Sequence, residues 1–376
     1  MKKNILSNFG AKAKTFFWGN EDPADKYFLH KSLGGFNDVR SQKQFLRLHE
    51  IDLYVNRGID LRAQKLSEVQ FVLKNKAGKI VDRNNVIDLL NRPNEYQTAK
   101  QFWKLWAKHY YITGNSYILM EGKGDKLFDK NNIKSLRLLE PSRVRIIFNP
   151  DQSEIIRFDY TSLGGETVEY KPEQIIYIYD PDPNFPLRGI SMLRSGIRAI
   201  ETDLSISEYQ SRVLKNGGKV EGVFKFKAVL NAKQIAEMKE KYKEQNNLEN
   251  SGDPLFLGGD ADYINLGLTP AELSYLETKK ITFSDICILT GVPEALLSLR
   301  DMKFDNADAA VAIFAREKVK PDIEMLVDHL DWKFVPEEFE LTFIDPTPEN
   351  QDRTINLIKA GYDTDSSTIN ERRLLL

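Results

Sequence analysis

The stretch from Leu89 to Met120 constrains the fold more than any other part of this chain. It reads LLNRPNEYQTAKQFWKLWAKHYYITGNSYILM. A leucine-ended helix stops at the Asn-Arg-Pro-Asn run of residues 91–94, and an aromatic-rich helix then runs to the Gly-Asn pair at 114–115. Thr98 precedes Gln101 by three residues, which is the spacing of a capping box. Because helix start and stop signals fall so close together, we expect helix, turn, helix and strand in that order.

The composition is that of a folded protein with large cores. Of 376 residues, 41% are hydrophobic and 29% are charged, so the chain is not disordered by composition. The length suffices for two or three ordinary domains or one extended subunit. With 53 basic and 55 acidic residues, the net charge of −2 argues against a simple nucleic-acid clamp, which would show a basic excess. The single cysteine, Cys287, excludes an internal disulfide framework and fits synthesis in a reducing cytoplasm.

The sequence lacks signals for membrane insertion and for metal binding. No apolar run approaches the ~20 residues that a membrane-spanning helix needs. Residues 1–45 begin with a basic, amphipathic stretch that has no secretory cleavage site. We expect them to form a flexible arm that packs on a neighbouring subunit or on the protein surface, with a membrane-surface helix as the alternative. We expect no zinc site and no cofactor, because one cysteine and four scattered histidines are poor ligands for zinc (His30, His49, His109 and His329).

The first half of the chain after the arm mixes helices and strands. We expect a helix from Glu50 that leads into a strand at Val69–Leu73. Between residues 116 and 180, short β-rich runs alternate with Gly and Asn-Pro breaks. These runs are 117–120, 136–139, 144–148, 155–160, 167–170 and 175–179. They predict a meander or a small mixed sheet beside helices, and therefore an α+β fold.

Two long helices bracket a compact insertion. The first spans about residues 190–216 and ends at a Gly-Gly pair. The second begins at Thr269-Pro270, where an N-cap threonine precedes a first-turn proline, and it stops at Gly291. The insertion should contain a helix at 232–244 and strands at 220–226, 254–257 and 263–266. Because the ends of the two helices must return close together, we expect an antiparallel stalk with the insertion at its tip.

The chain should close with another helix and a strand. The helix is expected from Ala307 to Phe334, with a kink near Pro321, because proline removes a backbone hydrogen bond. The strand is expected at Phe339–Ile344.

The pattern xLLxRPNxxxTxxxFW…GNxYxxx resembles the portal proteins of tailed bacteriophages, specifically the HK97-like portal family. The resemblance extends over about residues 50–370. It also includes Gly291-Val292-Pro293 followed by Asn306, the Lys320-Pro321 pair, and Asn370-Glu371-Arg372. It implies an α+β portal-type subunit with an α/β wing, a two-helix stem, a small αβ clip, a tunnel loop and a helical crown.

The resemblance also divides the chain into parts. After the N-terminal arm of residues 1–45, it implies a wing at 46–190, a first stem helix at 191–216, a clip at 217–268, a second stem helix at 269–292, a tunnel loop at 293–306, a returning wing helix and strand at 307–348, and a crown at 349–376. Relatives commonly continue beyond the point where this chain ends, so the crown is expected to be short or truncated.

The resemblance implies a head-to-tail connector of a phage particle. Such proteins form closed rings, usually dodecamers, at one capsid vertex of the virion, and double-stranded DNA passes through them without sequence-specific contacts. The implied partners are the large terminase, a head-tail adaptor, and the major capsid and scaffold proteins; no membrane, cofactor or catalytic site is implied. Near-balanced charge fits a channel in which DNA slides, because a lysine-lined tunnel would bind phosphates tightly. Most soluble proteins have balanced charge too.

Two groups of residues are candidates for contacts in such a ring. In the segment at 293–306, leucines would narrow the channel and cations would touch phosphates (Leu296, Leu297, Leu299, Arg300 and Lys303). The alternative is an ordinary loop between helices with its leucines buried. In the insertion, strand edges could pair with a neighbouring subunit or a partner (Val223, Phe224, Phe226, Leu255, Phe256 and Leu257). The charges at 232–244 are expected to be a solvated helix face.

The aromatic residues of the 98–111 helix allow two readings. They could stack on bases, but their spacings of three, four and seven place them on one helix face, which favours a hydrophobic core (Phe102, Trp103, Trp106, Tyr110 and Tyr111).

Two other functions remain as alternatives. A different ring-forming head-tail adaptor is the nearer one, although an adaptor would not need two long helices around an insertion. A metal-dependent nuclease or hydrolase could use carboxylates at Asp180, Asp182 and 301–308. No P-loop, G-x-S-x-G or H-E-x-x-H motif accompanies those carboxylates.

Overall fold

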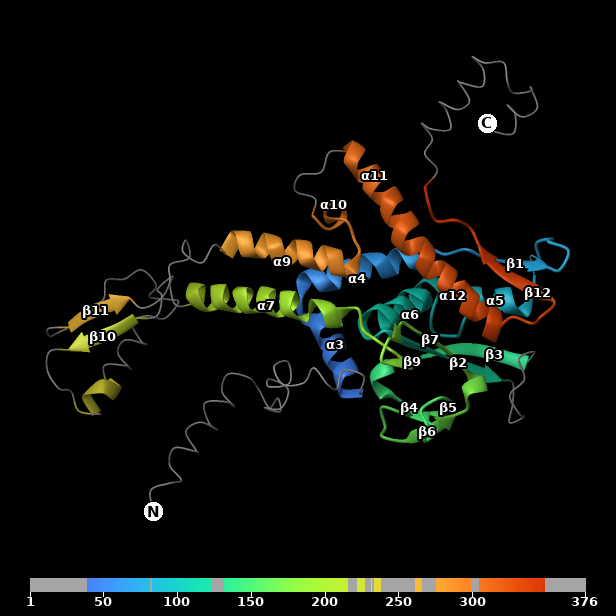
Figure 1. Cartoon of the computed structure of the whole chain (residues 1–376), viewed down its shortest axis with the longest axis horizontal. Coiled ribbons are helices and arrows are strands. Elements are labelled where there is room, and N and C mark those ends of the chain that lie inside the picture. Colours follow the sequence, from blue (N-terminus) through green and yellow to red (C-terminus); the bar gives the residue numbers. More distant parts are fainter. Residues whose placement is uncertain are drawn as a thin grey trace, which may run out of the picture.

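A computed structural model of the chain describes residues 39–81, 83–122, 132–215, 222–226, 231, 233–237, 261–265, 275–298 and 304–348. Most described elements gather in one body, from which two long helices project as a stalk (Figure 1). No helix among the described residues is both long and apolar enough to cross a bilayer. Mixed helices and sheets agree with the predicted α+β class.

The body begins earlier than the sequence suggested. Helix α3 (Val39–Ile51) takes in the last residues of the expected arm, and Phe45 is only 3% exposed. A second helix, α4 (Leu53–Leu66), follows after a break at Asp52, whose side chain accepts hydrogen bonds from the backbone N–H of Tyr54 and Val55. The single helix expected from Glu50 is therefore two helices, because Asp52 caps the second one. The rest of the expected arm lies outside the described residues.

The Leu89–Met120 stretch folds as predicted. It contains α5 (Asn85–Asn91), α6 (Ala99–Thr113) and the start of β2 (Asn115–Gly122). Thr98 and Gln101 form the expected capping box, and Gly114 ends α6 with a φ of +71°. The aromatic residues of α6 lie in the core, which confirms the core interpretation over base stacking.

Six strands of the body form two antiparallel sheets. The first has the order β3-β2-β7 and the second the order β4-β5-β6. Their bounds are β3 (Ile133–Leu139), β4 (Val144–Phe148), β5 (Ile155–Thr161), β6 (Thr167–Tyr170) and β7 (Ile175–Tyr179). The strands lie where the sequence predicts them. The expected single sheet is wrong, because β7 returns to pair with β2 and leaves β4–β6 as a separate layer.

The central strand β2 is buried on both faces. Its residues alternate between the two sides of the sheet. Ile118 and Met120 pack in the main core with the helices, whereas Tyr117 and Leu119 pack in a smaller core against the second sheet. A short hairpin of β8 (Pro181–Asp182) and β9 (Phe185–Gly189) then leads to the stalk.

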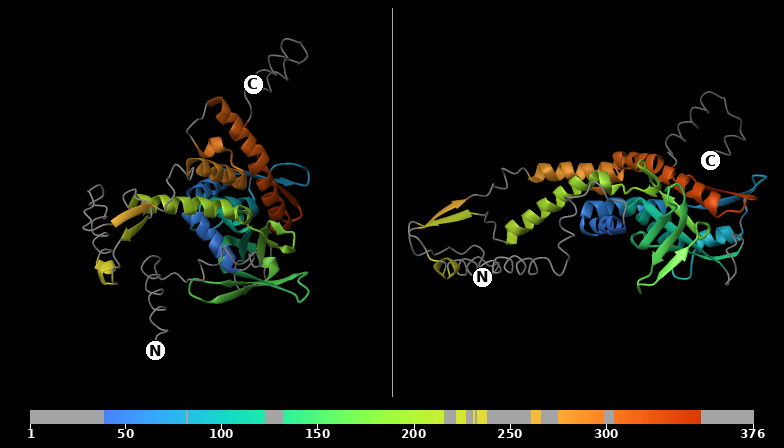
Figure 2. Two further views of the ribbon diagram at one scale, coloured as in Figure 1. Left: turned by 60° about the vertical axis from the view of Figure 1, so that its left-hand side comes forward. Right: turned by 60° about the horizontal axis from the view of Figure 1, so that its bottom comes forward.

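The stalk consists of α7 (Leu193–Lys215) and α9 (Tyr275–Thr290), which lie side by side (Figures 1 and 2). Beyond their far end, β10 (Gly222–Phe226) pairs with β11 (Ala261–Asn265) in antiparallel fashion. The expected strand at 263–266 is thus found at 261–265. The expected strand at 254–257 lies outside the described residues.

The C-terminal elements return to the body. They are α10 (Glu294–Leu297), α11 (Phe304–Phe314), the π-helical turn η5 (Ala315–Val319), α12 (Lys320–Lys333) and β12 (Phe339–Phe343). The expected interruption near Pro321 takes the form of the π-helical turn. Proline lacks the backbone N–H that donates a hydrogen bond in an α-helix. The π-helical turn changes the backbone hydrogen-bond pattern just before Pro321. Strand β12 pairs with β1 (Phe71–Asn75), and residues 349–376 lie outside the described part.

Candidate functional site

The stalk helices are antiparallel and closely packed, as the sequence predicts. Gly196 of α7 faces Leu289 of α9, and a Cβ atom on this glycine would lie 2.3 Å from the leucine Cδ2. Further out, the Thr282 hydroxyl donates to the buried Asp203 carboxylate at 3.2 Å. From Gly196 to Asp203 the position in α7 moves forward along the chain, whereas the contact in α9 moves back from Leu289 to Thr282. The two helices therefore run in opposite directions.

One face of α9 is not covered by any other described element. Ile281 and Ile288 are 61% and 77% exposed. They are seven residues apart, which places them on the same side of the helix two turns from each other. Lys279, on another face of α9, donates to the Ser207 hydroxyl of α7 at 3.0 Å. The exposed isoleucines therefore lie on the side of α9 that α7 does not cover, with the exposed Asp285 between them.

The body end of α9 meets α4 at a glycine. A Cβ atom on Gly58 would lie 2.8 Å from Cγ2 and 2.9 Å from Oγ1 of Thr290, so any larger residue here would force the Thr290 side chain or a helix to shift. The next residue, Gly291, has a φ of +68° and turns the chain away from the helix. Gly291-Val292-Pro293, which resembled the family, is thus the turn that ends α9 against the body.

A buried ionic cluster joins the same end of α9 to α12. The Arg62 guanidinium binds both carboxylate oxygens of Asp322, at 2.8 and 2.9 Å, and donates to the Thr290 carbonyl at 3.1 Å. The Tyr111 hydroxyl donates to the same Asp322 carboxylate at 2.6 Å. Burial and the neighbouring Asp322 raise the pKa of Tyr111 well above its usual range, so this hydroxyl remains a neutral donor. We call Arg62, Tyr111, Thr290 and Asp322 the joint cluster.

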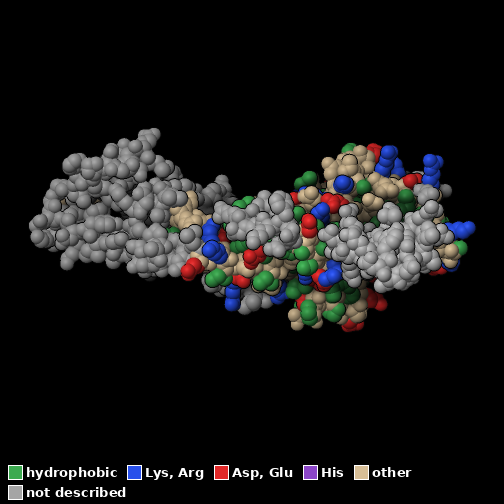
Figure 3. Space-filling view, turned by 90° about the horizontal axis from the view of Figure 1, so that it is seen from above, with side chains coloured by type: hydrophobic (Ala, Val, Ile, Leu, Met, Phe, Trp, Pro, Cys, Tyr) green, Lys and Arg blue, Asp and Glu red, His purple; other side chains and the backbone are tan. Residues whose placement is uncertain are grey.

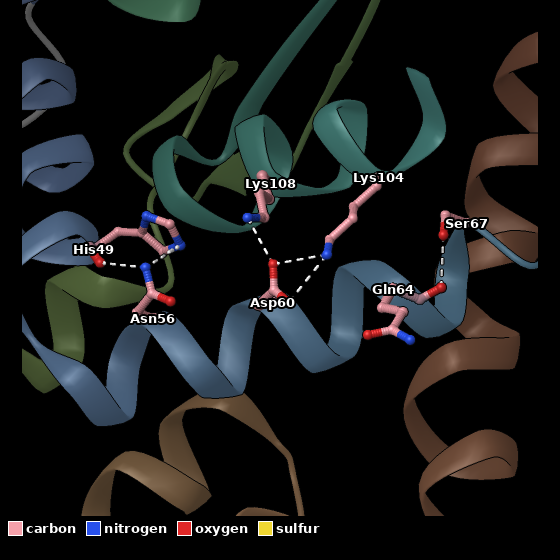
Figure 4. Close-up of polar contacts among 7 residues, drawn as sticks. All are labelled: His49, Asn56, Asp60, Gln64, Ser67, Lys104 and Lys108. Carbon is pink, nitrogen blue, oxygen red and sulfur yellow. Dashed lines mark hydrogen bonds and ion pairs between the residues drawn. The ribbon is translucent and has the colours of Figure 1, made fainter. Parts of the chain in front are cut away.

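Helices α4 and α6 are tied together beside the joint cluster (Figure 4). Lys104 and Lys108 of α6 reach Asp60 of α4 at 2.9 and 2.7 Å. Partial burial opposes ionisation of Asp60, but hydrogen bonds from both lysines lower its pKa. Nearby, Asn56 donates to the His49 carbonyl at 3.1 Å, and burial lowers the pKa of His49 to about 4. His49 is therefore neutral at physiological pH and has a structural role.

The residues that carried the family resemblance also act as structural links. Asn94 accepts backbone N–H groups of its own turn and donates to the Leu136 carbonyl of β3 at 3.1 Å. The Asn115 carboxamide accepts from the Tyr177 hydroxyl at 2.6 Å and from the Gly189 N–H at 3.0 Å. Since Gly189 ends β9 shortly before α7 begins, Asn115 fixes the path of the chain into the stalk.

The predicted channel residues are placed only in part. Leu296 and Leu297 lie in α10 and are half-buried against the main core. Leu296 lines an apolar cavity of about 160 Å³ with Leu61 of α4 and Phe314 of α11. Leu299, Arg300 and Lys303 lie outside the described residues. The two leucines thus contact the body of their own subunit, and a role for the other three in a channel stays a prediction.

The predicted contact residues of the insertion are also placed in part. Val223, Phe224 and Phe226 lie in β10, opposite Ile264, Tyr263 and Ala261 of β11. Leu255, Phe256 and Leu257 lie outside the described residues. Because β10 and β11 pair only with each other within the described part of the chain, each offers one edge that other strands could use.

Charges on the described surface are mixed. In the view of Figure 3, lysines and arginines alternate with aspartates and glutamates and do not gather in one basic patch. Within the described ranges, no group of three or more His, Cys, Asp or Glu side chains is placed to hold a metal ion. The Cys287 thiol lies at the base of the stalk, and burial raises its pKa to about 12, so it is not a reactive nucleophile.

The joint cluster was not found from the sequence. Arg62 and Asp322 are 260 residues apart, and no local pattern links them. A signal did exist for Gly58, because a glycine within a helix often marks a close approach of another element.

Comparisons with known proteins agree with this architecture. The sequence matches the family described as phage portal protein over residues 54–376. A protein of Rickettsia bellii strain RML369-C, described as uncharacterized, is 23% identical over 375 residues, which covers 95% of this chain and 94% of the relative.

Two solved structures show the same fold. A chain from the neck of a native gene transfer agent particle, computed with C12 symmetry, has a TM-score of 0.64 at 21% identity and covers 90% of this chain and 93% of its own. An HK97-family phage portal protein from Corynebacterium diphtheriae has a TM-score of 0.58 at 13% identity and covers 82% of this chain and 96% of its own.

The family match begins in α4 and takes in the signature stretch, the stalk and the returning helices. The resemblance carried by the Leu89–Met120 stretch is therefore confirmed. The same match sets aside the nuclease or hydrolase alternative. The chain belongs to the phage portal protein family, and it is a structural subunit of a head-to-tail connector and not an enzyme.

Proposed function

We propose that this chain assembles into a closed ring of twelve copies at one vertex of a phage-like particle. Double-stranded DNA passes through the ring during packaging and ejection, with contacts that do not depend on sequence. Family membership supports the proposal, as does the fold shared with a neck chain whose particle was computed with C12 symmetry.

The observation that carries the proposal is the pair of exposed isoleucines, Ile281 and Ile288, on the face of α9 that α7 does not cover. A stalk of two helices leaves faces that only another molecule can cover, and exposed apolar surface on a projecting element marks such an interface. In a closed ring, each stalk lies between two identical neighbours, so one face of every copy meets a different face of the next. Ile281 and Ile288 then become part of a repeated contact around the channel.

The parts of the subunit take the following roles in this ring. Residues 46–190 and 307–348 form the wing, the helices within 191–216 and 269–292 form the stem, residues 217–268 form the clip, and residues 349–376 contribute to the crown. The clip is the farthest described part from the body, as β10 and β11 indicate (Figure 1). It is therefore the surface on which the terminase and later a head-tail adaptor dock, with Val223, Phe224, Phe226 and residues 255–257 as contacts.

The segment 293–306 forms the tunnel loop. Leu296 and Leu297 anchor its first turn to the body, because both pack against the main core. Leu299, Arg300 and Lys303 then lie in the part that faces DNA. A few cations per subunit give weak contacts that repeat around the ring, which permits sliding more readily than one tight site.

Electron microscopy and native mass spectrometry of the full-length protein test the ring directly. We expect closed rings with a central hole and a mass near twelve subunits. The double variant Ile281→Lys/Ile288→Lys should lower the ring fraction at least tenfold at equal concentration. Leu163→Lys is the matched control, because Leu163 is an isolated exposed leucine of the body. A wild-type protein that stays monomeric, or rings that tolerate both lysines on α9, would contradict the proposal.

A further inference from the structure

A pocket of about 410 Å³ opens in the body between β4 and β9. All five residues of β4, Val144 to Phe148, line it, together with Gln42 of α3 and Arg188 of β9. The pocket therefore runs along the length of one strand. It has no part in the stalk or in the loop of residues 293–306.

The strand that lines the pocket has an open edge. Within the described chain, β4 pairs only with β5, so it is the terminal strand of the β4-β5-β6 sheet. In an antiparallel sheet, alternate residues of an edge strand direct their N–H and C=O groups outward. Such an edge is a template for another strand, and proteins usually cover it. The pocket places unfilled space along this edge.

One buried polar atom in the pocket, Oε1 of Gln42, has no hydrogen-bond partner among the described residues. Most buried polar groups in native proteins are hydrogen-bonded, so an unpaired one at this pocket indicates a missing polar partner. An added peptide backbone supplies both donors and acceptors.

The pocket is also positively charged. The Arg188 guanidinium lies over the rings of Phe148, at 4.8 Å, and Phe185, at 5.6 Å. Arg145 lies on the exposed part of the same strand edge. No described carboxylate forms an ion pair with Arg145 or Arg188. An occupant with acidic residues beside apolar ones would match this lining.

We propose that residues 21–33 of the same chain add to β4 as an extra strand and fill this pocket. The segment reads EDPADKYFLHKSL, in which Glu21, Asp22 and Asp25 precede the apolar run Tyr27-Phe28-Leu29, with Lys26 between them. Gln42 lies in the first turns of α3, so the chain enters the described structure at the rim of the pocket. Five residues separate the segment from Val39, and they can span roughly 17 Å when extended. Gly34-Gly35 among them permits a reversal of direction.

The docked segment has a consequence for assembly that goes beyond the proposed ring. It covers an open sheet edge on a protein that is present in many copies at one place. Helix α3 packs against the turn Pro141–Arg143 that leads into β4, so the segment and α3 hold the sheet from two sides. Without it, β4 can pair with strands of other subunits.

Hydrogen exchange of the full-length protein, read by mass spectrometry, tests the docking. We expect backbone amides of β4 to be protected, and deletion of residues 1–33 to speed their exchange at least tenfold. The control is β6 (Thr167–Tyr170), the other edge of the same sheet, whose exchange should not change. Equal exchange of β4 in the two proteins would overturn the proposal.

Cross-linking identifies the occupant and remains informative if the deletion variant does not fold. In a Cys287→Ala background, Ile147→Cys is combined with Phe28→Cys, and a short bis-maleimide is added. We expect a cross-link within one chain. A cross-link that forms only between chains, when the two cysteines are placed on separate subunits and mixed, would overturn the assignment to the same chain. The absence of any cross-link, also with Tyr27→Cys or Leu29→Cys, would overturn docking itself.

Discussion

Replacing Arg62 by methionine should detach the body end of α9 from α12. Arg62 and Asp322 side chains are only 14% and 13% exposed, and they share two hydrogen bonds. Removing one partner of a buried ion pair leaves the other charge uncompensated, which costs about 3–5 kcal/mol. The Tyr111 hydroxyl still donates to Asp322, so we expect a loss of unfolding free energy near the lower limit, about 3 kcal/mol.

Urea unfolding followed by tryptophan fluorescence measures this loss, since Trp103 and Trp106 lie in the same core. The protein concentration must be equal for all variants, because assembly adds to apparent stability. Arg316→Met is the matched control: Arg316 pairs with Glu317 at 2.9 Å, but the two side chains are 65% and 58% exposed. We expect that control to cost less than about 0.5 kcal/mol.

A double-mutant cycle shows whether the cost arises from the pair. Arg62→Met combined with Asp322→Leu removes both charges, and the double variant should lose at least about 1.5 kcal/mol less than the sum of the single variants. The reasoning would be refuted if Arg62→Met behaved like Arg316→Met, or if the two single losses simply added.

Three further predictions follow from contacts in the body. Gly58→Ala should cost about 1–3 kcal/mol by overpacking against Thr290, and Thr290→Ala should recover part of the loss; strict additivity of the two melting-temperature changes would contradict this. Asn115→Ala should cost about 3 kcal/mol in urea unfolding, because buried partners lose their hydrogen bonds, whereas Asn149→Ala in an exposed turn should cost under about 1 kcal/mol; equal losses would count against the link. Burial lowers the pKa of His109 to about 4, so the unfolded chain takes up a proton near pH 6.5 while the native state does not. This group alone should therefore lower stability by about 2–3 kcal/mol as the pH drops from 6.5 toward 4, and His109→Gln should reduce the slope of melting temperature against pH, with the rest of the slope left by His49; an unchanged slope would rule out this origin.

Local elements were predictable where the sequence carries local signals. Strands β4, β6 and β7 have the bounds that alternation and turn residues predict, and the capping box of Thr98 forms as expected. Nearly all of helix α3 was missed, since the predicted helix began only at Glu50. The buried positions of α3 are spread among charged residues and resemble a solvated arm. Helix prediction depends on the periodic spacing of hydrophobic residues within one segment. In α3 this spacing is weak, because the helix has only one short buried face.

Partners in space were less predictable than elements. Nothing in β7 specifies that it pairs with β2, since several strands have the same apolar character. The Gly114-Asn115 pair ends a helix, as expected. The contact of Asn115 with Gly189 could not be expected from this local pattern, because Gly189 lies 74 residues away in the sequence. Arg62 and Asp322 are more distant still. Such contacts arise from tertiary packing, and the family resemblance placed the elements without naming these pairs.

The pairing of β1 with β12 sets an order in which a newly made subunit can fold. Phe71 lies opposite Phe343, so more than two thirds of the chain is inserted between the two strands. Contacts across the stalk join residues 72 and 79 positions apart and can form while translation continues. Strand β1 must wait for the last described strand to leave the ribosome. Pairings of such long sequence separation form slowly. The body of each subunit is therefore completed late, after the helices of the stalk have already been synthesised.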